Sequence, residues 1–402
     1  MSNMKTIAFV TPWFGMNIPG GAEEEARELA KHLLAAGMDV EILTTCIKEF
    51  NSDWNINYHK EGEYREGDLL VRRFKADHRD TQAFNDVNVK LMRNLPISID
   101  EEEIFLKNMA NSSRLYAYME KNKDSYSAFI FVPYMFGTTY YGCQICPEKS
   151  ILIPCFHDES YFYMEHFKET FSKVAGLVYN AAPERDLTVA NYPLHKDIKQ
   201  IVMGIGMNTD QTGDAARFRK KFNIENPFIM YAGRKDKGKN IDTLLQYFSE
   251  FKKRMPEYSD LGLVLIGGGS VEIPDSIRND VRDLGFVDRQ DKYDAYAAAE
   301  VLCQPSQHES FSFVIMESWL AERPVMVADQ CAVTRNFCKE SNGGLWFKDY
   351  FEFEGALKYL LDNTDAAEVM GINGRDFVKK SFSWDVIIEK YKKFFGDIDQ
   401  CL

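Results

Sequence analysis

The 402-residue chain lacks any long hydrophobic run and any regular set of cysteines. Its first ten residues, MSNMKTIAFV, hold one lysine before an apolar run that is too short for a signal peptide or a bilayer-spanning helix. The eight cysteines are scattered, which is typical of reduced thiols in the cytosol. We therefore expect a cytoplasmic protein.

The chain also lacks an excess of positive charge. It has 48 lysines and arginines against 61 aspartates and glutamates, which gives a formal net charge of -13. Because a phosphate backbone repels an acidic surface, nucleic acid is excluded as the main partner. An acidic average can conceal a local basic face, so peripheral contact with the inner face of a membrane stays open.

Patterns that bind metals are absent as well. Cys143 and Cys146 form a CxxC pair, but no second pair with zinc-ribbon spacing follows. His157, Asp158 and Glu159 stand together after a strand, yet they lack partners at helical spacing. We expect no bound metal.

What the chain does contain is an alternation of strands and helices, in two cycles. In the first cycle, strands are predicted at 5–14, 39–45, 127–134, 150–156 and 176–180, with an amphipathic helix after the first. In the second cycle, they are predicted at 227–233, 261–269, 300–306 and 324–329. This order predicts two parallel α/β sheets. A hinge is predicted at 201–214, and an elaborated loop region with helical pieces at 46–126.

Two cations stand in the loop that opens the second cycle. In YAGRKDKGKN, a strand ends at Gly233 and a helix begins near Asn240, with Arg234 and Lys239 between them. Ligands of open α/β sheets bind beyond the carboxyl ends of strands, and a helix N-terminus with flanking cations suits phosphate. The alternative is a solvated basic turn.

A glycine pair opens the helix after the first strand. Gly20 and Gly21 would let backbone N–H groups approach an anion closely. Alternatively, Glu23, Glu24 and Glu25 simply complement the helix dipole, with most of their side chains in water.

The stretch HESFSFVIMESW places Glu309 and Glu317 eight positions apart. If they flank one helix, their backbones are about 12 Å apart. That exceeds the roughly 5 to 9.5 Å between the paired carboxyls of glycoside hydrolases, so the spacing favours an elongated ligand held at both ends. His157, at a strand end of the first cycle, could bond a sugar hydroxyl or act on a substrate; a satisfied histidine beneath a loop is the alternative.

HESFSFVIMESW resembles the E-x7-E motif of retaining glycosyltransferases of family 4, whose GT-B fold has two Rossmann-like doubly wound parallel-sheet domains. PGGAEE, FHDE, GRKDKGK, LVLIGGG and LGFVDRQDKYDAYAAAEVLCQPSQHES follow the family's order of motifs. The closing FSWDVIIEKYKKFF looks like the family's last helix, which crosses back to the first domain. The resemblance implies an acceptor-side domain at 1–205 with the helix 383–402 packed on it, and a donor-side domain at 206–382.

By that resemblance, the chain is a retaining, metal-independent hexosyltransferase without a cofactor. It would move sugar from a nucleotide-diphosphate sugar to a glycan, lipid-linked or small-molecule acceptor, as in polysaccharide biosynthesis. Arg234 and Lys239 would contact the diphosphate, and Gly21 would approach it. Glu317 would hold the ribose hydroxyls, and Glu309 the transferred sugar.

The resemblance also implies contacts beside the first glutamate. Backbone N–H groups from Phe311 to Phe313 would help to bind the sugar, and His157 would face it from the first domain. The family often has Gly-Phe-Gly here, whereas this chain has Ser310, Phe311 and Ser312. The serines narrow the room for the sugar, so they leave its identity open.

Several other functions remain to be weighed. An NAD-dependent oxidoreductase is disfavoured, because GGGSVE has Glu272 where the dinucleotide fingerprint requires its third glycine. A sugar-nucleotide epimerase or a glycoside phosphorylase would suit the same fold. A non-catalytic scaffold would have no reason to keep Arg234, Lys239, Glu309 and Glu317 together.

Overall fold

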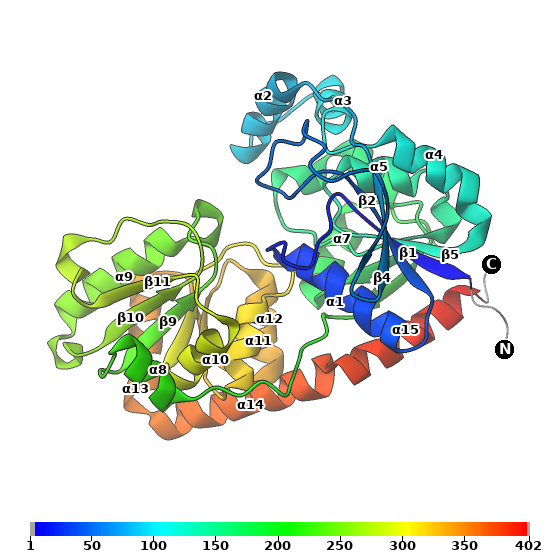
Figure 1. Cartoon of the computed structure of the whole chain (residues 1–402). Coiled ribbons are helices and arrows are strands. Elements are labelled where there is room, and N and C mark those ends of the chain that lie inside the picture. The colour runs from blue at the N-terminus through cyan, green and yellow to red at the C-terminus, as the bar shows by residue number, and fades with distance from the viewer. Residues whose placement is uncertain (1–4, 400–402) are drawn as a thin grey trace. The chain divides into compact units, whose positions relative to one another are not determined.

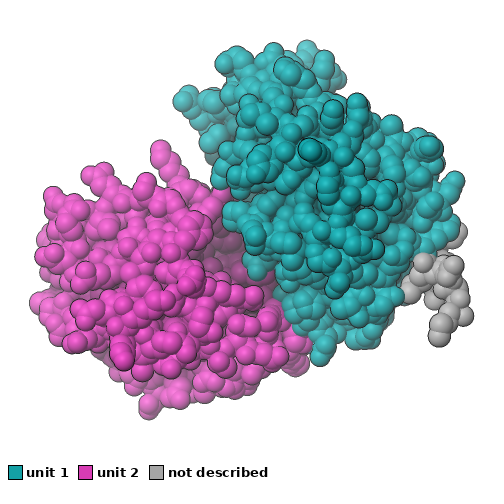
Figure 2. All heavy atoms as spheres, in the orientation of Figure 1, with its two compact units in different colours: residues 1–206, 384–402 teal, residues 207–383 magenta. Residues whose placement is uncertain are grey.

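The computed structural model describes residues 5–399, which form two compact units (Figure 2). Unit 1 comprises residues 1–206 and 384–402, and unit 2 comprises residues 207–383. Each unit has one sheet, and helices flank both faces of each sheet (Figure 1). The predicted α/β class with two doubly wound sheets is therefore confirmed.

Unit 1 contains an eight-stranded sheet in the order β3-β4-β2-β1-β5-β6-β7-β8. Neighbouring strands are parallel except β3 and β4. The strands are β1 (Thr6–Thr11), β2 (Val40–Thr45), β3 (Gly62–Glu66), β4 (Leu69–Phe74), β5 (Tyr126–Phe131), β6 (Ser150–Leu152), β7 (Gly176–Tyr179) and β8 (Lys199–Val202). The helices are α1 (Gly21–Ala35), α2 (Thr81–Met92), α3 (Ile99–Lys107), α4 (Ser113–Asn122), α5 (Gly137–Cys143), α6 (Glu165–Phe171), α7 (Ala182–Asn191) and α15 (Trp384–Asp399).

The C-terminal helix α15 packs on α1 within unit 1, where Figure 1 shows the two in red and blue. The ring of Trp384 stacks on His32 of α1, with centroids 3.7 Å apart. Trp384 also lies on Gly206, where a side chain of any size would overlap the indole. Residues 400–402 of the predicted helix lie outside the described residues.

Unit 2 contains a six-stranded, all-parallel sheet in the order β11-β10-β9-β12-β13-β14. The strands are β9 (Phe228–Ala232), β10 (Gly262–Ile266), β11 (Val281–Gly285), β12 (Val301–Gln304), β13 (Val325–Ala328) and β14 (Gly344–Phe347). The helices are α8 (Ala215–Phe222), α9 (Ile241–Arg254), α10 (Arg289–Ala298), α11 (Phe313–Leu320), α12 (Ala332–Ser341), α13 (Tyr350–Asp362) and α14 (Thr364–Phe382). The central strands are buried on both faces, which explains their continuous apolar sequences.

Residues 46–126 contain more regular structure than the loop region with helical pieces that the sequence predicts. They contain β3, β4 and three helices, α2, α3 and α4. The apolar pattern of β4 is obscured because the buried position after Leu69 and Val71 is Arg73, whose guanidinium donates to the carbonyl of Phe14 at 2.8 Å. The helical piece expected at 104–121 is interrupted between α3 and α4, where Ser112 caps the second helix.

Each sheet reverses its strand order at one point. In unit 1 the chain runs from β1 to β2 on one side and later places β5 on the other side of β1. In unit 2 it runs from β9 to β10 and β11, and then returns to place β12 on the opposite side of β9. A crevice forms at the carboxyl ends of strands where the order reverses, and this is where open α/β sheets bind ligands.

Neither a membrane span nor a metal cluster is found in residues 5–399. The helices there are too short or too polar to cross a bilayer. No three His, Cys, Asp or Glu side chains among them could hold a metal ion together. Burial raises the pKa of the Cys146 thiol to about 11 and that of Cys143 well above its ordinary value.

Two helical glycines give opposite expectations for replacement by alanine. A Cβ at Gly374 of α14 would overlap the indole of Trp319, whereas a Cβ at Gly355 of α13 would meet no atom within 4 Å. We expect Gly374→Ala to lower the free energy of unfolding by roughly 1–3 kcal/mol through overpacking. Gly355→Ala should raise it by roughly 0.5–1 kcal/mol through helix propensity. Urea denaturation of both variants checks this packing, and equal effects would contradict it.

Candidate active site

The reversal point of unit 2 joins Lys239 to Glu309. Lys239 follows β9, and Glu309 follows β12. The Lys239 ammonium lies 2.6 Å from Glu309 Oε1, and the same oxygen accepts a hydrogen bond from the buried Gln304 amide at 3.1 Å. Both charged groups are mostly buried, so their attraction is screened less than that of a surface pair.

The backbone of Arg234 is fixed while its guanidinium extends into solvent. The Tyr231 hydroxyl donates to the Arg234 carbonyl at 2.5 Å. The side chain is 64% exposed, and Asp236 is 3.4 Å from it. The arrangement leaves a cation beyond the carboxyl end of β9, beside the Lys239–Glu309 pair in sequence, that can turn toward an anionic ligand.

Asn240 does not cap α9 as the sequence predicts. It has a left-handed backbone, and its side chain accepts no hydrogen bond from the backbone N–H groups of the first turn of α9. Its amide instead donates to the carbonyl of Pro305 at 3.2 Å, and its side-chain oxygen accepts from Thr243. Asn240 thus fastens the loop after β9 to the loop after β12, on which Glu309 lies.

Glu317 has its own partners, Lys292 and Tyr296. It is buried on α11, which begins only at Phe313, so Glu309 lies in the preceding loop. The ammonium of Lys292 lies 2.5 Å from Glu317, and the buried Tyr296 hydroxyl donates to it at 2.9 Å. Burial and the adjacent Glu317 raise the pKa of Tyr296 well above its usual range, so this hydroxyl keeps its proton.

No local sequence pattern indicates that Lys292 and Tyr296 are partners of Glu317. Their spacing of four places them on one side of α10, but an amphipathic helix offers many such pairs. Lys235 was also missed. Its side chain is fully buried, and its ammonium donates to the Gly267 carbonyl at 2.6 Å and to Asp283 at 2.7 Å. It fastens the loops after β9 and β10 to strand β11.

The two serines between Glu309 and Phe313 have different backbone conformations. Phe311 is buried, with its ring 5.0 Å from Phe382, and Phe313 starts α11. Ser312 precedes that helix with a φ of 82°, and its buried hydroxyl has no hydrogen-bond partner. Ser310 has no left-handed backbone.

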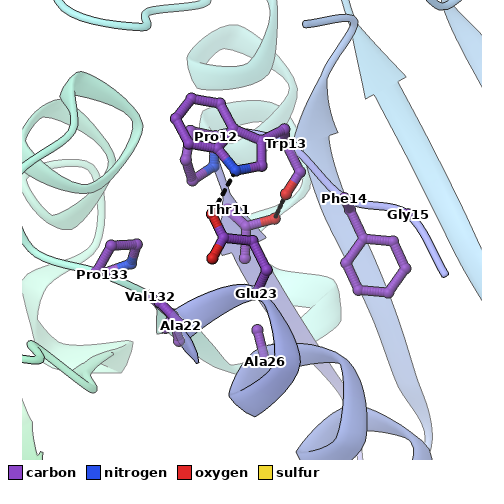
Figure 3. Close-up of a pocket in the computed structure, with 10 residues that line it drawn as sticks. All are labelled: Thr11, Pro12, Trp13, Phe14, Gly15, Ala22, Glu23, Ala26, Val132 and Pro133. Atoms are coloured by element: carbon purple, nitrogen blue, oxygen red, sulfur yellow. Dashed lines mark hydrogen bonds between the residues drawn. The ribbon is translucent and has the colours of Figure 1, made fainter. Parts of the chain in front are cut away.

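In unit 1, the carboxylate of Glu23 lies over Gly20, the first of the two glycines. Gly20 has a φ of 140°, and a Cβ there would overlap the Glu23 carboxylate. Trp13 donates its indole N–H to Glu23 at 2.7 Å. Trp13 and Glu23 line a small pocket at the reversal point between β1 and β5 (Figure 3). Gly21, the first residue of α1, is exposed.

The expectation that the glutamates of this turn mostly face water is wrong for Glu25. Its side chain is buried in the interior of unit 1 rather than at the helix surface, whereas Glu24 is exposed. The helix period explains the difference, because Glu25 lies on the same face as the buried Leu29.

His157 lies in the loop after β6, about one quarter exposed. Its Nδ1 is 3.4 Å from Glu159, and that carboxylate accepts a hydrogen bond from the Tyr134 hydroxyl at 2.9 Å. The carboxylate therefore faces one ring nitrogen of His157. In unit 2, Arg234, Lys239 and Glu309 follow strands β9 and β12, and Glu317 lies on α11. In unit 1, His157 follows β6, and Gly20 and Gly21 stand at the start of α1.

The similarity to a known protein family lies in the second unit. Residues 214–377 match the family model for glycosyl transferases group 1. A D-inositol 3-phosphate glycosyltransferase from Corynebacterium aurimucosum is 27% identical over 55% of this chain and 56% of its own length. The chain spans about half the length of such relatives. An uncharacterized glycosyltransferase from Methanocaldococcus jannaschii is 21% identical over 98% of this chain and 99% of its own length.

Solved structures match the whole chain. Sucrose-phosphate synthase from Thermosynechococcus elongatus gives a TM-score of 0.71 at 18% identity, covering 99% of this chain and 100% of that one. The chain has the GT-B fold. HepE from Anabaena, in complex with UDP and glucose, gives a TM-score of 0.69 at 13% identity, with 98% and 100% coverage. Together, the family model and these matches support a GT-B glycosyltransferase.

The backbone at Ser312 leads to a stability prediction. A left-handed non-glycine residue costs roughly 1–2 kcal/mol, and a buried hydroxyl without a partner adds a desolvation penalty. Ser312→Gly removes both, so we expect it to raise the free energy of unfolding by about 1 kcal/mol. Ser310→Gly is the matched control and should lower it slightly. Chemical denaturation checks the pair, and a less stable Ser312→Gly would contradict the assigned cause.

Proposed function

We propose that the chain is a retaining glycosyltransferase of the family 4 type. It moves a sugar from a nucleotide-diphosphate-sugar donor to an acceptor hydroxyl, without a bound metal or a cofactor. The observation that carries the proposal is the meeting of Lys239 and Glu309 at the reversal point of unit 2, with Arg234 in the same loop as Lys239. Residues 206–382 would bind the donor, and residues 1–205 with 383–402 the acceptor.

The two cations act on the leaving group. When the bond from the anomeric carbon to the diphosphate oxygen breaks, negative charge grows on the diphosphate and positive charge on the sugar. Fixed cations stabilise that charge more in the transition state than in the ground state. Lys239 is preorganised by Glu309, and Arg234 reaches the diphosphate from its exposed position.

The carboxylates act on hydroxyl groups. Glu309 accepts hydrogen bonds from the transferred sugar, and the backbone N–H groups from Phe311 to Phe313 add to this contact. Glu317 accepts hydrogen bonds from the ribose, and Lys292 and Tyr296 hold its carboxylate in place. The acceptor oxygen forms its new bond on the face that the diphosphate leaves, and its proton passes to a phosphate oxygen of the leaving group.

Unit 1 contributes to the same reaction in this proposal. His157 would bond a hydroxyl of the transferred sugar, and the backbone N–H groups at Gly20 and Gly21 would approach the phosphates. Glu23 lies over Gly20 in the structure and would have to move aside for an anion to do so. Acceptor specificity would come from the strand ends of this unit.

Named relatives and neighbours suggest the first ligands to test. HepE is described in complex with UDP-glucose, and an E. coli trehalose-6-phosphate structure with UDP-2-fluoro glucose. We therefore infer a UDP-sugar as the first donor to examine. The names D-inositol 3-phosphate glycosyltransferase and sucrose-phosphate synthase favour small acceptors, while glycans and lipid-linked sugars remain in the proposal.

A donor panel tests the proposed reaction. Purified protein is incubated with UDP-, GDP-, ADP- and TDP-sugars, and slow hydrolysis without acceptor is followed by product analysis. We expect one nucleoside diphosphate and free sugar with retained anomeric configuration. An epimerised nucleotide sugar would indicate an epimerase, and dependence on free phosphate a phosphorylase. Absence of turnover with every donor, and of thermal stabilisation by any nucleotide, would contradict the proposal.

Arg234→Ala tests the role of the exposed cation. We expect kcat to fall by roughly 10²- to 10³-fold, as for the loss of one preorganised charge-stabilising donor. Arg278→Ala is the matched control, because Arg278 is 61% exposed, pairs with Asp275 and lies just before the start of β11, at the opposite edge of the sheet. Steady-state kinetics on the two variants decide the point. Ordinary turnover in folded Arg234→Ala would remove it from the mechanism.

Glu317→Gln tests the ribose contact. A contact that acts alike in the ground state and the transition state affects binding more than bound-state chemistry. We expect a larger Kd for the nucleotide, with a smaller change in kcat, whereas Glu340→Gln on the exposed face of α12 should change neither. Calorimetry and single-turnover kinetics measure both quantities. An unchanged Kd with a much reduced kcat would assign Glu317 to the chemical step instead.

A further inference from the structure

Two buried glutamates lie in the interior of unit 1 without a cationic partner. Glu25 of α1 is 3% exposed, and Glu184 of α7 is 1% exposed. Neither forms an ion pair with a lysine or arginine in the part of the chain that the structure describes. A buried carboxyl without a counter-charge is costly, so this arrangement calls for a reason beyond packing.

Glu184 bonds to the backbone at two strand ends. One oxygen accepts from the Phe156 N–H at 2.7 Å, in the loop after β6, and the other accepts from the Asn180 N–H at 2.7 Å, just after β7. Both N–H groups lie beyond the last paired residues of their strands. Glu184 therefore accepts the hydrogen bonds that a neighbouring strand would accept farther back in the sheet.

Glu25 extends the same network to α1. Its carboxyl accepts from the Asn180 side chain at 3.0 Å and faces the Cys155 thiol at 3.5 Å. Glu25 lies four residues after Gly21, so the network connects the start of α1 to the ends of β6 and β7. Tyr391 of α15 is fully buried beside Glu25 and Cys155.

The backbone just before His157 is strained. Cys155 has a φ of 57°, a left-handed conformation that costs a non-glycine residue roughly 1–2 kcal/mol. Such a residue persists only where its surroundings hold it. The Glu184 bond to Phe156 comes immediately after this turn and immediately before His157, so it fixes the point from which the imidazole projects.

We propose that Glu184, supported by Glu25 through Asn180, is a positioning residue that sets the backbone from which His157 projects. This inference rests on the proposed role of His157. Glu184 acts through the Phe156 N–H and does not touch the substrate. Glu159 completes the arrangement by facing Nδ1 of the same imidazole.

A carboxyl suits this position better than an amide. Two N–H groups point at the two oxygens of Glu184, and a carboxyl group keeps acceptor capacity at both oxygens whether it is ionised or protonated. A glutamine offers one accepting oxygen, so its NH₂ group would face one of the two donors. Glu184→Gln should therefore release either Phe156 or Asn180 while preserving side-chain size.

The protonation of this network changes near neutral pH. Burial raises the pKa of Glu25 to about 7 and that of Glu184 to about 8, from an ordinary value of 4.5. The other titratable groups that face them are Cys155, Tyr179 and Tyr391. Because folding raises the two pKa values, Glu25 and Glu184 contribute to the free energy of unfolding through their protonated forms. This contribution is fully present below pH 4.5 and is lost as the pH rises through 7 to 8.

The test compares the wild type with Glu184→Gln and with Glu165→Gln. Glu165 is an exposed glutamate of α6 in the same unit, 64% exposed and paired with Lys168. Hydrogen–deuterium exchange of the segment containing Phe156 and the NMR titration of His157 report on position without requiring turnover. Kinetics with the best donor report on kcat, and calorimetry on the nucleotide Kd.

We expect Glu184→Gln to speed exchange at Phe156, to shift the His157 titration and to lower kcat by roughly 10- to 100-fold. The nucleotide Kd should stay within about twofold, because Glu184 bonds to Phe156 and Asn180 and to none of the residues proposed to contact the nucleotide, in unit 2 or at Gly20 and Gly21. The fall of Tm between pH 5 and 9 should be shallower than in the wild type. Glu165→Gln should match the wild type in all of these.

The outcomes separate this inference from the proposed function. Unchanged Phe156 exchange and an unchanged His157 titration in folded Glu184→Gln would overturn it. So would an equal loss of kcat and nucleotide affinity with an unaltered pH dependence, which a merely structural role predicts. If Glu184→Gln does not fold, Glu25→Gln is measured in the same way, with the same outcomes. If no donor is turned over but the exchange and titration change as expected, the positioning stands and the proposed function fails.

Discussion

The site in unit 2 depends on one ion pair, that between Lys239 and Glu309. The two residues are 70 positions apart in sequence and meet because β12 returns to the opposite side of β9. Asn240 reinforces the meeting by donating to the carbonyl of Pro305, and the buried Gln304 by donating to Glu309. Because the carboxylate of Glu309 holds the ammonium of Lys239 in one position, the cation is already in place when an anionic ligand binds. Charge-stabilising catalysis requires this kind of preorganisation.

The two glutamates of the unit 2 site and the two at the strand ends of unit 1 have different partners. In unit 2, Glu309 and Glu317 each have a lysine at 2.5 to 2.6 Å, so negative charge is neutralised where an anionic donor would bind. In unit 1, Glu25 and Glu184 have hydrogen-bond donors but no such cation among the described residues, and burial raises their pKa values. The first arrangement is suited to contact with a ligand. The second is suited to holding the backbone of a strand edge.

Most strands of the two sheets could be predicted from the sequence, but only part of the site could. Buried parallel strands such as β9 and β13 are continuous apolar runs, and Arg234 and Lys239 stand five positions apart in one loop, so both features could be predicted. Strand β4 could not, because its inward-facing Arg73 breaks the apolar pattern. The partnership of Lys292 with Glu317 depends on how α10 packs beside α11, and no local spacing encodes that contact.

Calorimetric titration of a sugar-free nucleoside diphosphate into the wild type, Lys239→Met and Glu309→Gln tests the central claim most directly. The account predicts opposite effects. Removing the ammonium should weaken binding at least about tenfold, since a tenfold change corresponds to only about 1.4 kcal/mol. Neutralising the carboxylate should leave binding unchanged or tighten it, because it competes with the diphosphate for Lys239. Equal weakening by both substitutions, or no effect of Lys239→Met, would contradict the account.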